Sequence, residues 1–304
     1  MPYARRALVR PVSYEGRFAA LGRRWELRSN VPRAGEVLGR LFAAFHSQVR
    51  AETTSSVYEL VELVPEDGDD RPYELFLDGW SINRAMSPGT LVDWIVSDIT
   101  QEAIDSATGY AIVHASAAVF DGRTIVLPAP PEHGKTTTVA ALVRADWDFL
   151  TDEAALIGLD DGLVHPFARP LMISPSSMAA LPGLRDDLPA AYEPFRHFEH
   201  HVAPIDLRPD CLAAPAPLGF LVFPSYGEGR ATELTPLGRG EALVAVLDSC
   251  FNLPLLRGDG IRALSEVVRI ARCFRLSIGA IEPAVELLEA LARDELSLEA
   301  MLVR

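Results

Sequence analysis

The alternation of hydrophobic and polar residues changes its period along the first third of the chain. Residues 57–64 alternate apolar and polar side chains, and residues 73–77 repeat this pattern after an acidic turn. A period of two is typical of a half-buried strand, so the two segments predict a hairpin. Residues 24–29 are also strand-like, whereas the apolar residues between 35 and 49 recur at helical spacing. These patterns predict a small mixed α/β domain over residues 1–107.

A helix and a strand pair lead the chain into its second half. Residues 87–107 begin with Ser-Pro-Gly-Thr and place their large aliphatic residues on one broad face, which predicts a helix linking two domains. Residues 110–120 and 123–127 are apolar segments on either side of Asp121-Gly122, a dipeptide typical of a hairpin turn. This strand pair is expected to deliver the chain into a loop that ends in Gly-Lys-Thr.

Strands and helices alternate in the part that follows, and a second domain is predicted over residues 108–304. A proline-rich stretch at 175–217 is expected to be irregular, either as a substrate loop or as a long surface excursion. Strands are predicted at 147–150, 154–159, 163–171, 218–223 and 273–277, and helices at 135–145, 239–249, 260–270 and 282–292. The whole chain is therefore expected to be an α/β protein.

Length and composition limit the classes of protein to consider. The 304 residues are 49% hydrophobic and 23% charged, which suffices for one large domain or two smaller ones with separate cores. The longest apolar runs fall well short of the roughly 20 residues that span a bilayer. No apolar signal-peptide core develops after the N-terminus. We therefore expect a cytoplasmic protein that has no membrane partner.

Charge and cysteine content argue against further classes. A formal net charge of −14 is unsuited to nucleic-acid binding, which relies on clustered lysine and arginine. Cys211, Cys250 and Cys273 are widely spaced and form no CxxC pair, so neither a disulfide framework nor a zinc site is expected. We interpret the three cysteines as buried thiols.

Lysine occurs once in the chain, as Lys135, and arginine supplies every other fixed side-chain cation. This lysine stands in Gly134-Lys135-Thr136, which matches the end of a Walker phosphate loop. The Walker pattern also has a glycine five positions before Gly134, where this chain has Ala129. The motif is incomplete, but the one lysine of the chain occupies the position that binds phosphate in such loops.

A phosphate loop binds its anion through converging backbone N–H groups, the positive end of the following helix and a lysine. Pro130 and Pro131 each lack an N–H and hold φ near about −65°, so the front half of this loop must be unusual. A Glu132 carboxylate facing phosphate would repel it unless it points away or meets a metal ion. The predicted nucleotide-binding residues are Glu132, His133, Gly134, Lys135, Thr136 and Thr137.

Three residues are candidates for metal binding and proton transfer. The hydroxyl of Thr136 is placed to bind Mg²⁺, as the residue after the lysine does in this motif class. Its alternative is an ordinary residue in the first turn of a helix. Asp152 and Glu153 follow a short apolar strand downstream, where nucleotide-binding folds place a carboxylate for the metal or for deprotonating a hydroxyl. A plain turn is the alternative for this acidic pair.

A cluster of histidines occurs in the proline-rich stretch. His197 and His201 have the spacing that presents two imidazoles on one helix face, and Glu193 is nearby. The cluster reads His-Phe-Glu-His-His and lacks the HExxH order of a zinc hydrolase. We interpret it as a solvated loop cluster, with a metal site as the alternative.

The chain resembles the HPr kinase/phosphorylase family, and especially the related small kinases found beside peptide natural-product genes, some of which phosphorylate a serine of a lasso peptide. The resemblance extends over about residues 108–292. The motifs that carry it are His114-Ala115-Ser116-Ala117, Asp121-Gly122-Arg123, Gly134-Lys135-Thr136-Thr137 and Phe149-Leu150-Thr151-Asp152-Glu153-Ala154, followed more loosely by residues 169–171, 218–224 and 274–279.

The resemblance implies a core like that of HPr kinase and phosphoenolpyruvate carboxykinases, rather than a doubly wound NTPase fold. It implies that Asp152 accepts the proton of the acceptor hydroxyl, that Lys135 binds phosphate, and that Thr136 binds the metal, for which the position of Glu153 after the strand makes it a further candidate. His114 would be an active-site histidine, with a core histidine as its alternative. Arg169 is a candidate for holding phosphate or substrate, with a surface arginine as its alternative.

The chain also departs from the family pattern. Ala129 and the two prolines replace a glycine-rich loop, and Glu153 stands where the family has a second aspartate. The later glycine-rich segment with a second metal-binding glutamate has no match. Phosphorylase activity is therefore not expected.

These observations predict a kinase that uses ATP and Mg²⁺ to phosphorylate a hydroxyl, with a serine of a peptide or protein, or a small hydroxyl metabolite, as acceptor. Two alternatives stay open. The first is a nucleotide-binding regulatory protein that has lost catalysis, and the second is a peptide-recognition partner that binds no nucleotide. Related enzymes form oligomers, so a homo-oligomer is also an expectation.

Overall fold

The computed structural model describes residues 12–48, 55–63 and 70–295, and it confirms a mixed α/β protein. The chain divides into two compact units. The first comprises Met1–Thr108, Arg169–Pro175 and Asp186–Ala203, and the second comprises Gly109–Ala168, Ser176–Arg185 and Pro204–Arg304. Two short segments from the later part of the chain thus belong to the first unit.

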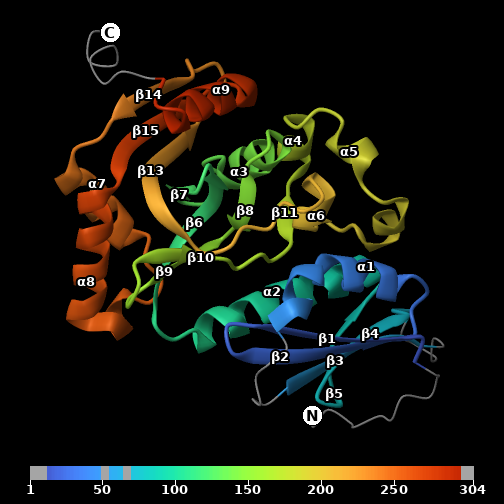
Figure 1. The fold of residues 1–304 in the computed structure, drawn as a ribbon. Helices are drawn as coiled ribbons and strands as arrows, with labels where there is room; N and C mark the ends of the chain where they lie inside the picture. The colour runs from blue at the N-terminus through green and yellow to red at the C-terminus, as the bar shows by residue number, and fades with distance from the viewer. Residues whose placement is uncertain (1–11, 49–54, 64–69, 296–304) are drawn as a thin grey trace. The chain divides into compact units, whose positions relative to one another are not determined.

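The first unit is built on a five-stranded sheet in the order β1-β2-β3-β4-β5. Strands β2 and β3 are parallel, and the other neighbours are antiparallel. Helices α1 and α2 lie on one face of this sheet (Figure 1). The bounds are β1 Tyr14–Ala20, β2 Arg23–Ser29, β3 Ser55–Glu62, β4 Tyr73–Leu77, β5 Trp80–Ala85, α1 Ala34–Leu41 and α2 Pro88–Ser106.

The predicted hairpin of this unit is confirmed, and the predicted helix at 35–49 is wrong in its length. Strands β3 and β4 pair antiparallel, with most of the acidic turn between them outside the described residues. Helix α1 ends at Leu41, and a 3₁₀-helix, η1 (Ala43–Gln48), continues the chain. Phe42 precedes η1 and Phe45 lies within it, the Phe45 N–H donates to the Phe42 carbonyl at 2.9 Å, and the two ring centroids are 5.9 Å apart. Packing of these two rings thus accompanies the change of helix type.

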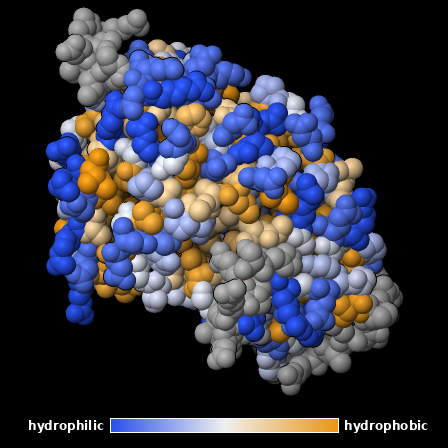
Figure 2. Space-filling view, in the orientation of Figure 1, coloured by the Kyte–Doolittle hydropathy of each residue, from blue (hydrophilic) through white to orange (hydrophobic). Residues whose placement is uncertain are grey.

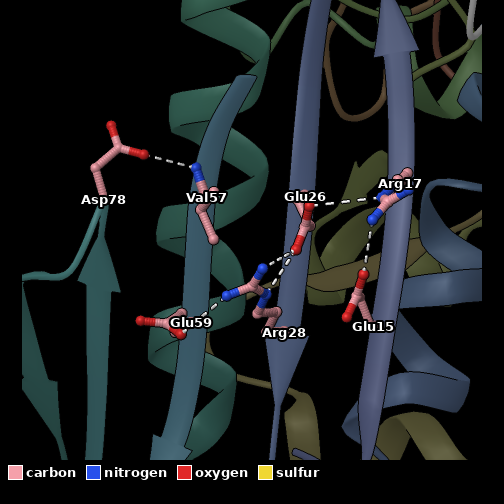
Figure 3. Close-up of polar contacts among 7 residues, drawn as sticks. All are labelled: Glu15, Arg17, Glu26, Arg28, Val57, Glu59 and Asp78. Atoms are coloured by element: carbon pink, nitrogen blue, oxygen red, sulfur yellow. Dashed lines mark hydrogen bonds and ion pairs between the residues drawn. The ribbon is translucent and has the colours of Figure 1, made fainter. Parts of the chain in front are cut away.

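Charged side chains form ion pairs across strands β1 to β3 (Figure 3). Arg17 lies opposite Glu26 in the strand register, with Nε 3.5 Å from Oε2. Arg28 lies opposite Glu59 with a separation of 3.8 Å, and it also contacts Glu26. Directly opposed charges of opposite sign stabilise a strand pair modestly. Burial raises the pKa of the Glu59 carboxyl, and the nearby Arg28 partly offsets this.

Helix α2 attaches to the sheet through an apolar stripe and two polar pairs. Its buried residues recur at helical spacing, among them Leu91, Ile95 and Ile99. The Trp25 indole N–H donates to Glu102 at 2.7 Å, and the buried Tyr58 hydroxyl donates to Asp98 at 2.5 Å. The predicted helix at 87–107 is thereby confirmed.

The second unit contains an eight-stranded mixed sheet in the order β10-β9-β6-β7-β13-β15-β14, with β8 paired to β6. Strands β7, β13 and β15 are mutually parallel, while β6 is antiparallel to β7. The bounds are β6 Tyr110–Phe120, β7 Arg123–Pro128, β8 Asp148–Thr151, β9 Ala154–Gly158, β10 Leu163–His165, β13 Ala216–Tyr226, β14 Glu233–Pro236 and β15 Arg272–Ile278.

The two faces of β6 have different neighbours. Alternate residues from Ala111 to Val119 join a hydrophobic core with α7 (Arg239–Asp248) and α8 (Leu253–Ile270). Helix α3 (Lys135–Arg144) contacts β6, and it also contacts α9 (Ile281–Ala292). Because side chains alternate along a strand, His114 and Ser116 lie on the face opposite the α7–α8 core.

The expectation of an irregular stretch at 175–217 is wrong, because five short elements occupy much of it. Each has only three to six residues, too few for a helical or strand period to show in the sequence. Strand β11 (Leu171–Ile173), at the end of the predicted strand 163–171, pairs with one of them. The five short elements are α4 Pro175–Ala179, α5 Leu184–Asp187, η2 Ala190–Phe195, β12 His200–Val202 and α6 Pro204–Leu207.

The three cysteines are free thiols, as expected, but they differ in burial. Cys211 and Cys273 are buried and Cys250 is half-buried. Burial raises the pKa of the Cys211 thiol to about 11. In the described part of the chain, no helix has the length and apolar composition needed to cross a membrane. Hydrophilic and hydrophobic residues are interspersed over the face shown in Figure 2.

Candidate functional site

The predicted phosphate loop lies between a strand and a helix of the second unit. Strands β6 and β7 form a hairpin whose turn residues, Asp121 and Gly122, have φ of 46° and 73°. Both angles are in the left-handed region that a two-residue hairpin turn requires. Strand β7 ends at Pro128, and α3 begins at Lys135. The strand, loop and helix predicted from the sequence therefore occur in that order.

The back half of the loop contains two residues in left-handed backbone conformation. Glu132 has φ of 65° and Gly134 has φ of 88°. Glycine adopts this conformation without a steric penalty, whereas glutamate does so at a cost. The side chain of Glu132 is exposed, and His133 is partly buried. The Thr138 backbone N–H and hydroxyl both donate to the Gly134 carbonyl, at 2.9 and 2.8 Å, which closes the first turn of α3.

Lys135 folds back onto the front half of its own loop. Its Nζ donates to the carbonyl oxygens of Ala129 at 2.5 Å and Pro130 at 2.9 Å, and the side chain is buried. Burial lowers the pKa of Lys135, while the nearby charges of Asp152 and Glu153 oppose that shift. The front half of the loop therefore presents carbonyl acceptors to the lysine, and its two prolines supply no N–H donors for an anion.

Asp152 accepts hydrogen bonds from two hydroxyl groups. Thr136 Oγ1 lies 3.1 and 3.0 Å from the two carboxylate oxygens, and Ser116 Oγ donates to Oδ1 at 2.5 Å. Ser116 is fully buried, and Asp152 is 3% exposed. The first residues of α3 are thus joined to the strand end that carries the predicted acid.

A break in strand pairing positions the acidic pair. Strands β8 and β9 both pair antiparallel with β6, so that Ala117 lies opposite Thr151 and His114 lies opposite Ala154. The two residues between these pairs are Asp152 and Glu153. The Ala115 N–H donates to the Glu153 carbonyl at 3.2 Å, and Glu153 has φ of 111°, a strained angle for a residue other than glycine.

His114 lies beside Glu153 and against an aromatic ring. Its Nε2 is 3.3 Å from Glu153 Oε1, and its ring stacks on Phe251 with centroids 5.2 Å apart. The Glu153 side chain is 41% exposed and that of His114 is 18% exposed, so this pair is more accessible than Asp152. The structure therefore brings His114, Lys135, Thr136, Asp152 and Glu153 into one connected set.

Two predicted residues remain, Thr137 and Arg169. The Thr137 hydroxyl lies 2.8 Å from Ser177 Oγ, which joins α3 to α4. Arg169 is buried rather than a surface residue, and it belongs to the first unit.

The side chains of this set suit a magnesium ion bound to nucleotide phosphates. The oxygens of Thr136, Asp152 and Glu153 are hard ligands, and Mg²⁺ is commonly held by one or two carboxylates together with phosphate oxygens. Among the described residues, no group of three or more His, Cys, Asp or Glu side chains is arranged to hold a metal ion. Any metal here would therefore need ligands from the nucleotide and solvent as well.

Sequence reasoning missed three residues that contact the predicted site. Ser116 could have been found from its spacing, because it lies two residues after His114 on the same strand face. No comparable pattern marks Phe251 or Ser177, which reach the site from distant segments. The histidine cluster was misinterpreted, since His201 is buried and both His197 and His201 contact Asp93 in the first unit.

Comparison with models of known protein families and with curated proteins finds no match to this chain.

Proposed function

We propose that the protein is a kinase that transfers the γ-phosphoryl group of ATP to a hydroxyl, most simply the serine of a peptide or protein. The observation that carries this proposal is the contact of Thr136 with Asp152 beside Lys135. In nucleotide-binding loops, the residue after the lysine and a downstream aspartate share a magnesium ion. Here the two side chains already lie within hydrogen-bond distance.

Each residue of the set has a role in this proposal. Lys135 would exchange the carbonyls of Ala129 and Pro130 for phosphate oxygens, and its burial favours exchange for a more negative partner. Asp152 would accept the proton of the acceptor hydroxyl, while Ser116 holds its carboxylate in place. A bound magnesium ion would supply charge neutralisation on the phosphates. Phosphoryl transfer depends mostly on such positioning and neutralisation.

The accessible pair of His114 and Glu153 would face the acceptor side of the reaction. An imidazole 3.3 Å from a carboxylate fixes the orientation of that carboxylate. Glu153 would contribute an oxygen to the metal. Because its side chain is exposed, the cost of bringing it to the metal is small.

The sheet supports a core like that of HPr kinase and phosphoenolpyruvate carboxykinases. The strand before the loop, β7, has an antiparallel neighbour, β6, and a parallel neighbour, β13. A doubly wound nucleotide-binding fold would instead use a mostly parallel sheet with crossover helices. The mixed sheet therefore favours the first fold family.

Incubation of the full chain with γ-labelled ATP, Mg²⁺ and serine-containing peptides encoded near its gene tests the proposal. We expect transfer of label to a serine, and loss of transfer in Lys135→Ala. A panel of small hydroxyl metabolites tests the other acceptor class. Absence of transfer to every acceptor, with ATP binding intact, would count against a kinase.

A second function is favoured by the loop itself, namely nucleotide binding without turnover. Pro130 and Pro131 provide no N–H, and Lys135 is already bound to two carbonyls of the same loop. Such a loop could bind nucleotide and signal its presence without catalysing transfer. Calorimetry with ATP and ADP on the wild type and Lys135→Ala, together with the labelled-ATP assay, separates the two functions, because this second function predicts Lys135-dependent binding with no transfer under any condition.

A further inference from the structure

A pocket in the first unit is independent of the site described above. Its volume is about 560 Å³, and it follows one exposed face of α2. Trp94, Ser97 and Asp98 line it from this helix, Asn83 from β5, and Phe198 from the segment between η2 and β12. All of its lining residues belong to the first unit.

The pocket presents polar groups whose hydrogen-bonding capacity is not used within the protein. Asp98 accepts a hydrogen bond from Tyr58 on Oδ2, and no described residue donates a hydrogen bond to its Oδ1. The side chains of Asn83 and Ser97 likewise have no hydrogen-bond partner in the part of the chain that the structure describes. These groups converge on one space, so a ligand could satisfy several of them together.

Two carboxylates and one imidazole, that of His197, are the ionisable groups of the described pocket lining. Asp93 and Asp98 contribute two carboxylates, and among the described lining residues there is no lysine or arginine. Asp93 already contacts His197 and His201, at 2.7 and 2.5 Å, which leaves Asp98 as the carboxylate with a free oxygen. Burial raises the pKa of Asp98, and a cation beside it would stabilise the ionised carboxylate.

Aromatic rings complete the pocket. Trp94 precedes Asp98 by one helical turn, so the two side chains are neighbours on the same face of α2. Phe198 is 78% exposed, which is unusual for so large an apolar side chain. An aromatic face beside a carboxylate suits a planar cation, because the guanidinium group stacks on rings and donates in its own plane.

We propose that this pocket binds the guanidinium group of an arginine in a peptide, stacked against Trp94 and hydrogen-bonded to Asp98. Arginine is favoured over lysine because the ammonium group is a compact, strongly hydrated charge that uses a ring face less well. The volume leaves space for the residues that flank the arginine. The inference does not depend on phosphoryl transfer in the second unit.

Calorimetric titration of the full chain with the peptide Ac-Gly-Arg-Gly-NH₂ tests the proposal. Ac-Gly-citrulline-Gly-NH₂ is the control, since citrulline has nearly the same shape and no charge. We expect the citrulline peptide to bind at least about tenfold more weakly than the arginine peptide. This is the usual effect of losing a charge-assisted hydrogen bond. Raising the salt from about 0.1 M to about 0.5 M should weaken arginine binding. Equal binding of the two peptides would overturn the proposal.

Two variants at one exposed position locate the binding. Ser97→Lys places an ammonium group in the pocket and should abolish arginine binding, whereas Ser97→Ala should keep it within about twofold. Both variants should fold, because Ser97 is exposed. Asp98→Asn should weaken binding about tenfold while it retains an acceptor for Tyr58. Unchanged binding in Ser97→Lys, with a native circular dichroism spectrum, would also overturn the proposal.

Discussion

Two aspartates, Asp152 and Asp93, use both carboxylate oxygens to join segments that are distant in sequence, but their donors differ. Asp152 receives the hydroxyls of Ser116 and Thr136, whereas Asp93 lies between the imidazoles of His197 and His201. A hydroxyl is neutral and can rotate to another partner. The first arrangement therefore leaves Thr136 able to turn to a ligand, while the second fastens one segment to a helix.

This difference shows that the same residue type has two uses in the chain. The carboxylate of Asp152 lies beside the buried Lys135 and the partly exposed Glu153, which are the other charged residues of the proposed catalytic set. Asp93 joins α2 to the segment 186–203, which belongs to the first unit. Substituting each aspartate should therefore affect a different property.

The largest effect is expected for Asp152→Asn. If this carboxylate accepts the acceptor proton, its loss should reduce the rate of phosphoryl transfer about a thousandfold. ATP affinity, measured by calorimetry in the absence of Mg²⁺, should change little. Asp148→Asn is the matched control, because Asp148 lies on β8, the strand that Asp152 follows, and its carboxylate pairs with Arg208. Full activity in Asp152→Asn would remove Asp152 from the proposed chemistry.

A smaller effect, on stability, is expected for Asp93→Asn. The amide keeps one acceptor oxygen but turns an N–H₂ group toward an imidazole that previously donated. We expect a loss of about 2 kcal/mol in the free energy of unfolding of the first unit. Urea unfolding followed by tryptophan emission measures it, with hydrogen exchange of β12 to locate the opening. The exposed Asp70 provides the control Asp70→Asn, which should be neutral. Unchanged protection of β12 would show that the histidines do not fasten this segment.

The smallest effect is expected in the alkaline stability of Lys135→Met. Burial lowers the pKa of Lys135 in the folded protein below its ordinary value of 10.5. At pH values between the folded and the unfolded pKa of Lys135, the unfolded chain binds more protons than the folded protein. The contribution of the lysine to the free energy of unfolding should therefore rise with pH. The methionine variant should lack this rise.

Urea unfolding between about pH 8 and pH 11, followed by circular dichroism, measures that difference. Burial raises the pKa of Tyr14 to about 12, so Tyr14 makes stability fall above its ordinary value of 10.0 in both proteins. Because Tyr14 is present in both proteins, its effect on stability cancels in the difference between the two pH curves. Parallel pH curves for the wild type and Lys135→Met would show that the lysine is not perturbed by burial.

The sequence predicted most elements longer than about ten residues, because a periodic apolar face needs several turns or alternations to show. Helix α2 and the β6–β7 hairpin are examples, and both lie where the patterns placed them. Strands β1, β5 and β14 were not predicted, and the short elements between 175 and 217 could not be, because each is too brief to show a period. Helix α8 begins at Leu253, earlier than predicted, and Arg257 interrupts it with non-helical angles.

Part of the candidate site could also be predicted from the sequence, because its residues lie close together along the chain. The glycine, lysine and threonine of the loop are adjacent in the chain, and the acidic pair ends the next strand. Ser116 was within reach because strand alternation places it beside His114. The contacts of Lys135 with the carbonyls of its own loop could not be predicted from the sequence, since they depend on the backbone path that two prolines impose.

The sequence by itself determined the α/β class, the order of strand, loop, helix and acidic pair, and the unique position of Lys135. These features are local, because backbone propensity and apolar period act over a few residues. Only the tertiary structure decided that Ser116 and Thr136 meet at Asp152, and that His197 and His201 meet at Asp93. The partners of Asp93 are 104 and 108 residues away in sequence, and pairs at such separation are set by the path of the whole chain.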